Sequence, residues 1–170
     1  MTALPTCPLL LPDHIAMVEG GVSTIVSSCD ARLRPSIMRA VGSTITPDGR
    51  QVTVYLSRRQ SRQLLLDVAT NGRIAVVFSV PFSHRTLQVK GQGARIRPAQ
   101  PADEPVLQRY LSAMEFEVGR VGFDARFTRA MLAFDLADVV AIDFQPGEAF
   151  DQTPGPRAGA ALPAGQGIST

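Results

Sequence analysis

Three arginines and two serines occur within six residues of the chain, in the run Ser57-Arg58-Arg59-Gln60-Ser61-Arg62. Guanidinium and hydroxyl groups donate hydrogen bonds to phosphate, and an arginine can donate two in parallel. The run lies where the alternation typical of a strand changes to a helical period, and a helix N-terminus offers free backbone N–H groups that favour anions. The run therefore indicates a phosphate-binding site, although a solvated first helical turn would have the same composition.

Basic residues are concentrated around this run. Residues 30–97 hold twelve basic residues, eleven of them arginine, against three aspartates, whereas the whole chain has a net charge of +2. Such asymmetry indicates an anionic partner for this segment. A nucleic acid is the weaker interpretation, because only Tyr55, Phe78 and Phe82 are aromatic there and no stacking motif accompanies the arginines.

Other reactive patterns are weak. The Gly-x-Ser-x-Gly motif of serine hydrolases does not occur, and Gly91-Gln92-Gly93 lacks the third glycine of a dinucleotide fingerprint. We expect these glycines to mark a bulge or close packing within a strand. Two cysteines and two histidines are too few for a convincing tetrahedral metal site. His84 falls in an expected turn and His14 in an expected surface helix, and we assign neither a role.

The length and composition describe one domain. The chain has 170 residues, of which 45% are hydrophobic and 19% charged. A chain of this length buries enough surface to need no disulfide or metal, so we expect Cys7 and Cys29 to be reduced. The first residues lack the features of a signal peptide, and no apolar run reaches the ~18 residues of a membrane span. We therefore expect a cytoplasmic protein.

Strand-like patterns recur six times, and helical periods occur between them. The expected strands are residues 22–29, 36–46, 51–57, 74–80, 86–96 and 139–144. Four helices are expected: one capped by Asp13, one that begins at Ser57 with Gln60 at capping-box spacing, one capped by Asp103, and a shorter one over residues 123–134. The second helix would bury Leu64, Leu65, Val68 and Ala69 and end at Gly72, and the third would bury a stripe from Val106 to Met114.

This order of elements disfavours a parallel doubly wound sheet, because strands and helices do not alternate one to one. It predicts a mainly β protein, a six-stranded antiparallel barrel with helices packed outside it. We expect the domain to cover residues 1–145, with 1–12 as an N-terminal extension. Residues 146–170 hold nine Gly and Pro among 25, and we expect this tail to be partly disordered.

Several segments, taken in order, resemble one family, the FMN-binding split barrels related to pyridoxamine 5′-phosphate oxidase. The segments that carry the resemblance are Asp30–Pro35, Val54–Arg62, Asn71–Phe78 and Arg85–Gly91. The resemblance covers about residues 14–97, with looser agreement up to Phe144. It implies a six-stranded split β-barrel that pairs into a homodimer, with FMN held in a groove between the subunits.

The resemblance also implies which residues bind the cofactor. Its phosphate would meet Met38 or Arg39 on the second strand, Ser57 at the end of the third, and Arg59, Ser61 and Arg62 at the helix start. The choice between Met38 and Arg39 stays open, because a one-residue slip turns a strand side chain to the other face. Leu56 would lie near the flavin ring, and Thr86 occupies the position of a glutamine in the oxidase. We name no catalytic residue, because the flavin carries the redox chemistry.

The chain departs from the true oxidase in two ways. No histidine follows His84, so the oxidase's Arg-x-His substrate motif is absent, and the chain has no tryptophan. We therefore expect an FMN-dependent oxidoreductase that acts on a small molecule other than pyridoxamine phosphate. Two alternatives stay open: a non-catalytic protein that binds flavin or haem, and a reductase that uses a deazaflavin.

Overall fold

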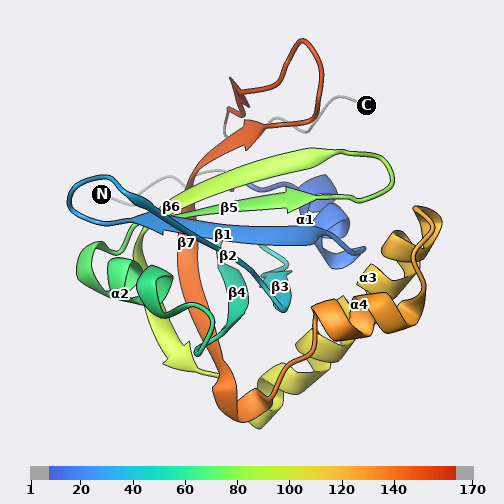
Figure 1. The fold of residues 1–170 in the computed structure, drawn as a ribbon. Helices are drawn as coiled ribbons and strands as arrows, with labels where there is room; N and C mark the ends of the chain where they lie inside the picture. The colour runs from blue at the N-terminus through green and yellow to red at the C-terminus, as the bar shows by residue number, and fades with distance from the viewer. Residues whose placement is uncertain (1–7, 164–170) are drawn as a thin grey trace.

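A computed structural model describes residues 8–163 (Figure 1). Its helices are α1 (Pro12–Glu19), α2 (Arg62–Asn71), α3 (Glu104–Arg120) and α4 (Ala125–Met131), with short 3-10 turns η1 (Pro101–Asp103) and η2 (Leu136–Asp138). Its strands are β1 (Ser23–Cys29), β2 (Pro35–Arg39), β3 (Gly42–Ile45), β4 (Val52–Ser57), β5 (Ile74–Ser79), β6 (Thr86–Pro98), β7 (Val139–Asp151) and β8 (Ala160–Ala161). No helix within residues 8–163 has the length and hydropathy needed to cross a bilayer.

The strands form one antiparallel sheet that curls on itself. Its order is β2-β1-β5-β6-β7-β4-β3, with β8 beside β7, so β2 and β3 lie at opposite ends. Only Ala40 and Val41 separate these two strands in sequence: the Ala40 N–H donates to Thr24 on β1 (2.9 Å), and the Val41 N–H donates to Tyr55 on β4 (2.8 Å). The sheet must curl to bring its two ends this close. The expected mainly β split barrel with peripheral helices is confirmed, with eight strands rather than six.

The single strand predicted for residues 36–46 is wrong, because that segment contains both β2 and β3. A strand pattern shows only that residues alternate, and it does not show that the two halves pair with different neighbours. Gly42 lies where the second half begins, and a Cβ at this position would come within 2.7 Å of the Leu107 side chain. The bend therefore depends on close approach of the backbone to α3.

The last strand is longer than predicted and continues from Phe144 to Asp151. The boundary placed at residue 145 therefore falls inside β7, and residues 146–151 are part of the sheet rather than of a tail. Pro146 is tolerated because the register shifts here: Gly91 pairs with Pro146 and Lys90 with Glu148, which leaves Gly147 as an extra residue. The bulge expected at Gly91 is thus confirmed. Residues 1–7, which include Cys7, and 164–170 lie outside the described residues.

The core lies between the curled sheet and the helices. It contains the side chains of every second residue along a strand, which point inward. In β1, Thr24, Val26 and Ser28 are buried, whereas the residues between them are half-buried on the other face of the sheet. The helix α3 contributes Leu107, Tyr110 and Met114 to the interior, as its predicted stripe required. The helix α1 is not a surface helix with a free histidine, because His14 is fully buried and burial lowers its pKa.

The helix α2 begins later than predicted, at Arg62, with Ser61 as its N-cap residue. The prediction is wrong at this end because Ser57 still pairs with Val139 in the sheet. Gly72, with a φ of 68°, ends the helix as expected. The buried stripe contains Leu64 and Val68, while Leu65 is half-buried and Ala69 is exposed. An unpredicted buried carboxylate, Asp67, accepts hydrogen bonds from Ser36 (2.6 Å) and Gln63 (2.8 Å).

A buried polar network joins the barrel to the start of α3. The Asp103 carboxylate accepts hydrogen bonds from the Tyr55 hydroxyl (2.8 Å) and from two nitrogens of Arg97 (2.7 and 3.0 Å). Arg97 also pairs with Asp143 at 3.0 Å. The Arg97 hydrogen bonds hold the pKa of Asp103 at about 2, and burial raises the pKa of Tyr55.

A pair of leucines in α2 tests the packing of this helix. Leu64 is 2% exposed and Leu66 is 60% exposed, so the same truncation has different consequences. We expect Leu64→Ala to lower the free energy of unfolding by about 2 to 5 kcal/mol, because it removes buried methyl groups and leaves a cavity. Leu66→Ala should leave it almost unchanged. Urea unfolding of the two variants checks this, and equal losses would show that α2 packs on another face.

The Asp103 network predicts how stability depends on pH. A carboxyl whose pKa is lowered on folding stabilises the protein above its unfolded pKa, and this contribution is lost as the pH falls through the folded value. Asp103→Asn should therefore cost about 2 kcal/mol of unfolding free energy near pH 7, and the difference from the wild type should close as the pH falls from about 4 to 2. Urea unfolding across this range measures the difference. Glu104→Gln, which removes an exposed carboxylate from the same turn, is the control.

Candidate functional site

A cavity of about 240 Å³ lies between β2 and the start of α2. Pro35, Ser36, Ile37 and Met38 line one side, and Gln60, Ser61, Gln63 and Leu64 line the other. The two sides come together because β2 ends the sheet, so no further strand separates its edge from α2. The cavity therefore combines two segments predicted to bind phosphate, the second strand and the strand-to-helix junction.

Hydrogen-bond donors without acceptors gather at this cavity. The Ser61 side chain is 1% exposed, and its Oγ has no hydrogen-bond partner within residues 8–163. The N–H groups of Arg62, Gln63 and Leu64, in the first turn of α2, have no backbone acceptor in the part of the chain that the structure describes. No acidic residue lies in this turn to compensate them. A buried donor without an acceptor is costly, so the site is suited to an anion that would accept these bonds.

Arg62 adds a positive charge at the same helix end. Its side chain is exposed and makes no hydrogen bond or ion pair with any described residue. A guanidinium that is not paired with a carboxylate can turn toward an anion at the cavity without breaking an existing contact. The sequence placed Ser61 and Arg62 at the helix start, and the structure puts both in the first turn or its cap.

Ser57 and Arg59 point to a different place, although they belong to the same six-residue run. The Ser57 hydroxyl donates to Asp138 at 2.6 Å, and the Arg59 guanidinium pairs with Asp138 at 3.2 Å. The Ser57 hydrogen bond is the main cause of the lowered pKa of Asp138. These residues line a second cavity, of about 260 Å³, with Phe134 and Asp138. The predicted phosphate-binding residues therefore lie at two places: Ser57 and Arg59 contact the Asp138 carboxylate, whereas Ser61 and Arg62 lie at the start of α2.

Met38 and Arg39 lie on opposite faces of β2. Met38 packs against the core and lines the cavity beside α2. Arg39 lies on the outer face, where its guanidinium donates to the Ser23 hydroxyl at 2.7 Å. The two candidates for the phosphate-binding residue of the second strand therefore differ in position: the apolar Met38 borders the cavity, and the charged Arg39 lies on the other face of the strand.

A polar row on the outer face of the sheet links Arg39 to Thr86. Ser23, which receives the Arg39 bond, pairs across β1 and β5 with Ser79. Ser79 pairs in turn with Thr86 on β6, and their hydroxyls lie 2.8 Å apart. Two residues predicted from separate segments therefore lie on one face, at the ends of a row that crosses four strands. Leu56 does not join them, because its side chain is fully buried in the core.

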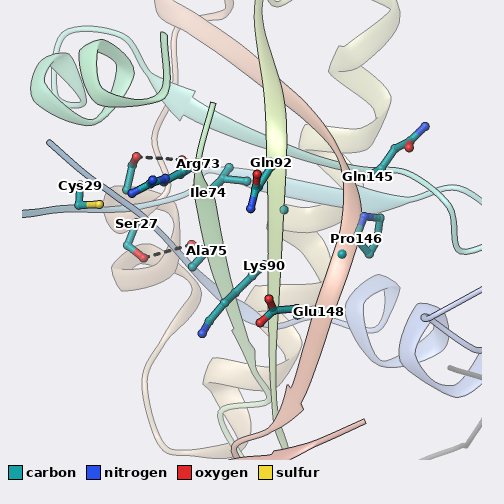
Figure 2. Close-up of a pocket in the computed structure, with 13 residues that line it drawn as sticks. Ser27, Cys29, Arg73, Ile74, Ala75, Lys90, Gln92, Gln145, Pro146 and Glu148 are labelled. Atoms are coloured by element: carbon teal, nitrogen blue, oxygen red, sulfur yellow. Dashed lines mark hydrogen bonds between the residues drawn. The ribbon is translucent and has the colours of Figure 1, made fainter. Parts of the chain in front are cut away.

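A larger groove, of about 700 Å³, opens toward the other end of the outer face (Figure 2). Cys29 and Ser27 lie on one side of it and Gln145 and Pro146 on the other, with Lys90 and Glu148 between them. The Lys90 ammonium lies 4.6 Å from the centre of the Phe150 ring, and Cys29 is a free thiol. Ser27, Ala75 and Gly91 make part of the lining small, so a flat molecule could approach the backbone closely.

The sequence analysis did not identify this groove. One wall comes from residues 145–148, of which Pro146–Glu148 were assigned to the tail. The alternation of β1, β5 and β6 could have placed Ser27, Ala75 and Lys90 on one face, since these residues are register partners. No pattern in the sequence marked Asp138 as a neighbour of Ser57. Within residues 8–163 no group of three or more histidine, cysteine or acidic side chains is arranged to hold a metal ion.

Comparison with solved structures gives the same fold in proteins of low sequence identity. The HupZ protein of Group A Streptococcus is 14% identical with a TM-score of 0.54, and the match covers 88% of this chain and 99% of that one. A protein from Lactobacillus delbrueckii, assigned as a pyridoxamine 5′-phosphate oxidase, is 11% identical with a TM-score of 0.52, covering 88% and 97%. An F420 reductase is 15% identical with a TM-score of 0.54, covering 82% and 98%.

These likenesses agree with the resemblance found in the sequence, and the chain has the fold of the split barrels related to pyridoxamine 5′-phosphate oxidase. No protein-family model matches the sequence, and no curated protein matches it either.

Replacing each of two buried serines tests whether the Ser61 hydroxyl lacks a hydrogen-bond partner when no ligand is bound. Ser28 donates to the Arg73 carbonyl at 2.8 Å, whereas Ser61 donates to no described atom. We expect Ser28→Ala to lower the free energy of unfolding by about 1 kcal/mol. Ser61→Ala should leave it unchanged or raise it, because no bond is lost. Urea unfolding without added ligand measures both, and a clear loss for Ser61→Ala would contradict the description of this site.

Proposed function

We propose that this protein binds FMN and acts as a flavin-dependent oxidoreductase on a small molecule. The observation that carries the proposal is the cavity beside α2, where the buried Ser61 hydroxyl and three backbone N–H groups have no acceptor among the described residues. A phosphate group supplies several acceptor oxygens and negative charge, which is what these donors and Arg62 require. The resemblance and the fold support a flavin as the carrier of that phosphate.

The remainder of the cofactor would extend over the outer face of the sheet. The polar row begins with Arg39 on β2, the strand that borders the phosphate cavity, and reaches Thr86 on β6. These hydroxyls and the guanidinium would hydrogen-bond the polar edge of a planar ring. Bound FMN supplies a ring that accepts and releases hydride or single electrons, and the protein's residues bind it, orient it and exclude water.

The outer face also supports a second copy of the chain as the partner. Half-buried and exposed apolar residues lie on it, and Ile37 on β2 is 66% exposed. Covering this face would bury those side chains and would close the groove that contains Lys90 over a bound ring. The homodimer is thus the assembly in which the cofactor would be enclosed.

A deazaflavin is the second candidate for the cofactor. The likeness in fold to an F420 reductase favours it, because that protein has the same barrel. Pyridoxamine phosphate remains disfavoured as substrate, since the chain lacks the histidine motif and the tryptophan expected of the oxidase. A non-catalytic flavin or haem protein would bind its ligand without turnover, so assays with reduced nicotinamides and quinone or nitro acceptors distinguish it from an enzyme.

A visible absorption spectrum of the purified protein, followed by titration with FMN, tests the proposal directly. We expect flavin absorption, or saturable binding of added FMN with quenching of its fluorescence. A colourless protein that binds no added FMN would refute the proposal. Saturable binding of a deazaflavin alone would replace FMN with the second candidate.

Removing the free cation from the helix start should weaken FMN binding. We expect Arg62→Ala to raise the Kd for FMN roughly 10- to 150-fold, since a hydrogen bond to a charged group contributes about 1.5 to 3 kcal/mol. The unfolding free energy should not change, because the side chain has no partner among residues 8–163. Arg126→Ala removes an exposed arginine from α4 and serves as the control. An equal Kd for both variants would place the phosphate elsewhere.

A further inference from the structure

Asp138 makes contacts with three consecutive residues of the strand-to-helix junction. It ends η2, immediately before β7, and is 81 residues away from Ser57 in sequence. Its carboxylate accepts hydrogen bonds from the Ser57 hydroxyl (2.6 Å) and the Arg59 N–H (3.3 Å), and it pairs with the Arg59 guanidinium (3.2 Å). Its carbonyl accepts a bond from the Arg58 N–H (2.7 Å).

These contacts decide what Ser57 can offer to a ligand. A serine hydroxyl has one hydrogen, and Ser57 donates it to Asp138. The same oxygen accepts a hydrogen bond from the Gln60 N–H at 3.4 Å. A phosphate placed against Ser57 would therefore receive no hydrogen bond from this hydroxyl. It would also lie close to the Asp138 carboxylate, whose oxygen is 2.6 Å from the Ser57 oxygen, and the two negative charges would repel. The hydroxyl is thus unavailable as a phosphate donor while Asp138 remains in place.

The carboxylate also offsets the charge of Arg59. The Arg59 side chain is 72% exposed, so it could reach an anion nearby if it were released, but its guanidinium is paired with a carboxylate that is 14% exposed. The two cavities of the junction are adjacent, since Gln60 lines both the one with Ser61 and the one with Asp138. A carboxylate in one of two adjacent cavities lowers the affinity of the other for an anion, and salt reduces this effect.

We propose that Asp138 is a specificity-determining residue of the phosphate site: it withholds Ser57 and Arg59 from the ligand and limits the affinity of the junction for phosphate. This inference rests on the proposed function. It confines the phosphate to Ser61, Arg62 and the first turn of α2. It also gives the junction less positive charge toward a ligand than its three arginines suggest, which disfavours ligands that are more highly charged than a single terminal phosphate.

The variant Asp138→Asn separates charge from shape. The asparagine oxygen can still accept the Ser57 hydrogen bond, and the backbone bond to Arg58 does not depend on the side chain. We expect its Kd for FMN to be about three- to tenfold lower than that of the wild type at low salt, because one negative charge is removed and Arg59 is released. Its Kd for riboflavin, which has no phosphate, should be unchanged, and high salt should remove the gain for FMN.

Asp48→Asn is the matched control. Asp48 accepts a hydroxyl bond from Thr46 (2.6 Å) and a backbone bond from Arg50 (3.1 Å), but it lies in the turn that precedes β4, whereas the junction follows this strand. Its loss of charge should change neither Kd. Fluorescence titration with FMN and with riboflavin, at low and high salt, gives all the values.

Several outcomes would overturn the inference. An unchanged or raised Kd for FMN in Asp138→Asn would show that Asp138 does not limit the affinity for phosphate. An equal gain in affinity for riboflavin would show that Asp138 acts through the shape of the junction and not through its charge. If that variant does not fold, Ser57→Ala gives the decision: its Kd for FMN should stay within about twofold of the wild type, whereas a tenfold loss would make Ser57 a direct ligand. Failure of the wild type to bind FMN would refute the proposed function and this inference together.

Discussion

The curl of the sheet is the constraint on which the other features depend. Two residues, Ala40 and Val41, connect strands at opposite ends of the sheet, and each donates a backbone hydrogen bond to a different neighbour. This closure leaves the outer edge of β2 free and brings it beside the start of α2. The cavity at Ser61 exists because no strand among residues 8–163 pairs with that edge. The core packing of α2 through Leu64 then fixes the helix end against it.

The junction shows how one short run of sequence can provide two separate environments. Ser57 is the last residue of β4 and takes its neighbours from the sheet and from η2, so its hydroxyl faces Asp138. Four residues later, Ser61 takes its neighbours from the helix and β2, and its hydroxyl faces a cavity. Two chemically identical side chains therefore differ in role, because the backbone changes direction between them. Charge counted along the sequence overstates the positive potential of this site.

The sequence predicted what depends on local patterns. Hydrophobic alternation located most strands, Gly72 located the end of α2, and the glycine at position 91 marked the bulge that the register confirms. Patterns could not show that residues 36–46 serve two ends of one sheet, because pairing partners are not encoded in alternation. The family resemblance, rather than a local pattern, implied that Leu56 lies near the flavin ring, and the residues on both faces of β4 are buried. The partners of Ser57 and the wall formed by Glu148 are long-range contacts, which become visible only when the chain is folded.

The unpaired edge of β2 has one further consequence. A terminal strand whose backbone groups have no partner can recruit a strand from another molecule, and this is a common origin of aggregation. Here the edge of β2 borders the Ser61 cavity, and Ile37 on this strand is largely exposed. A molecule held in that cavity would cover the strand as well as satisfy the donors. Under the proposed function, a phosphate bound in that cavity would therefore also shield this edge from pairing with a strand of another molecule.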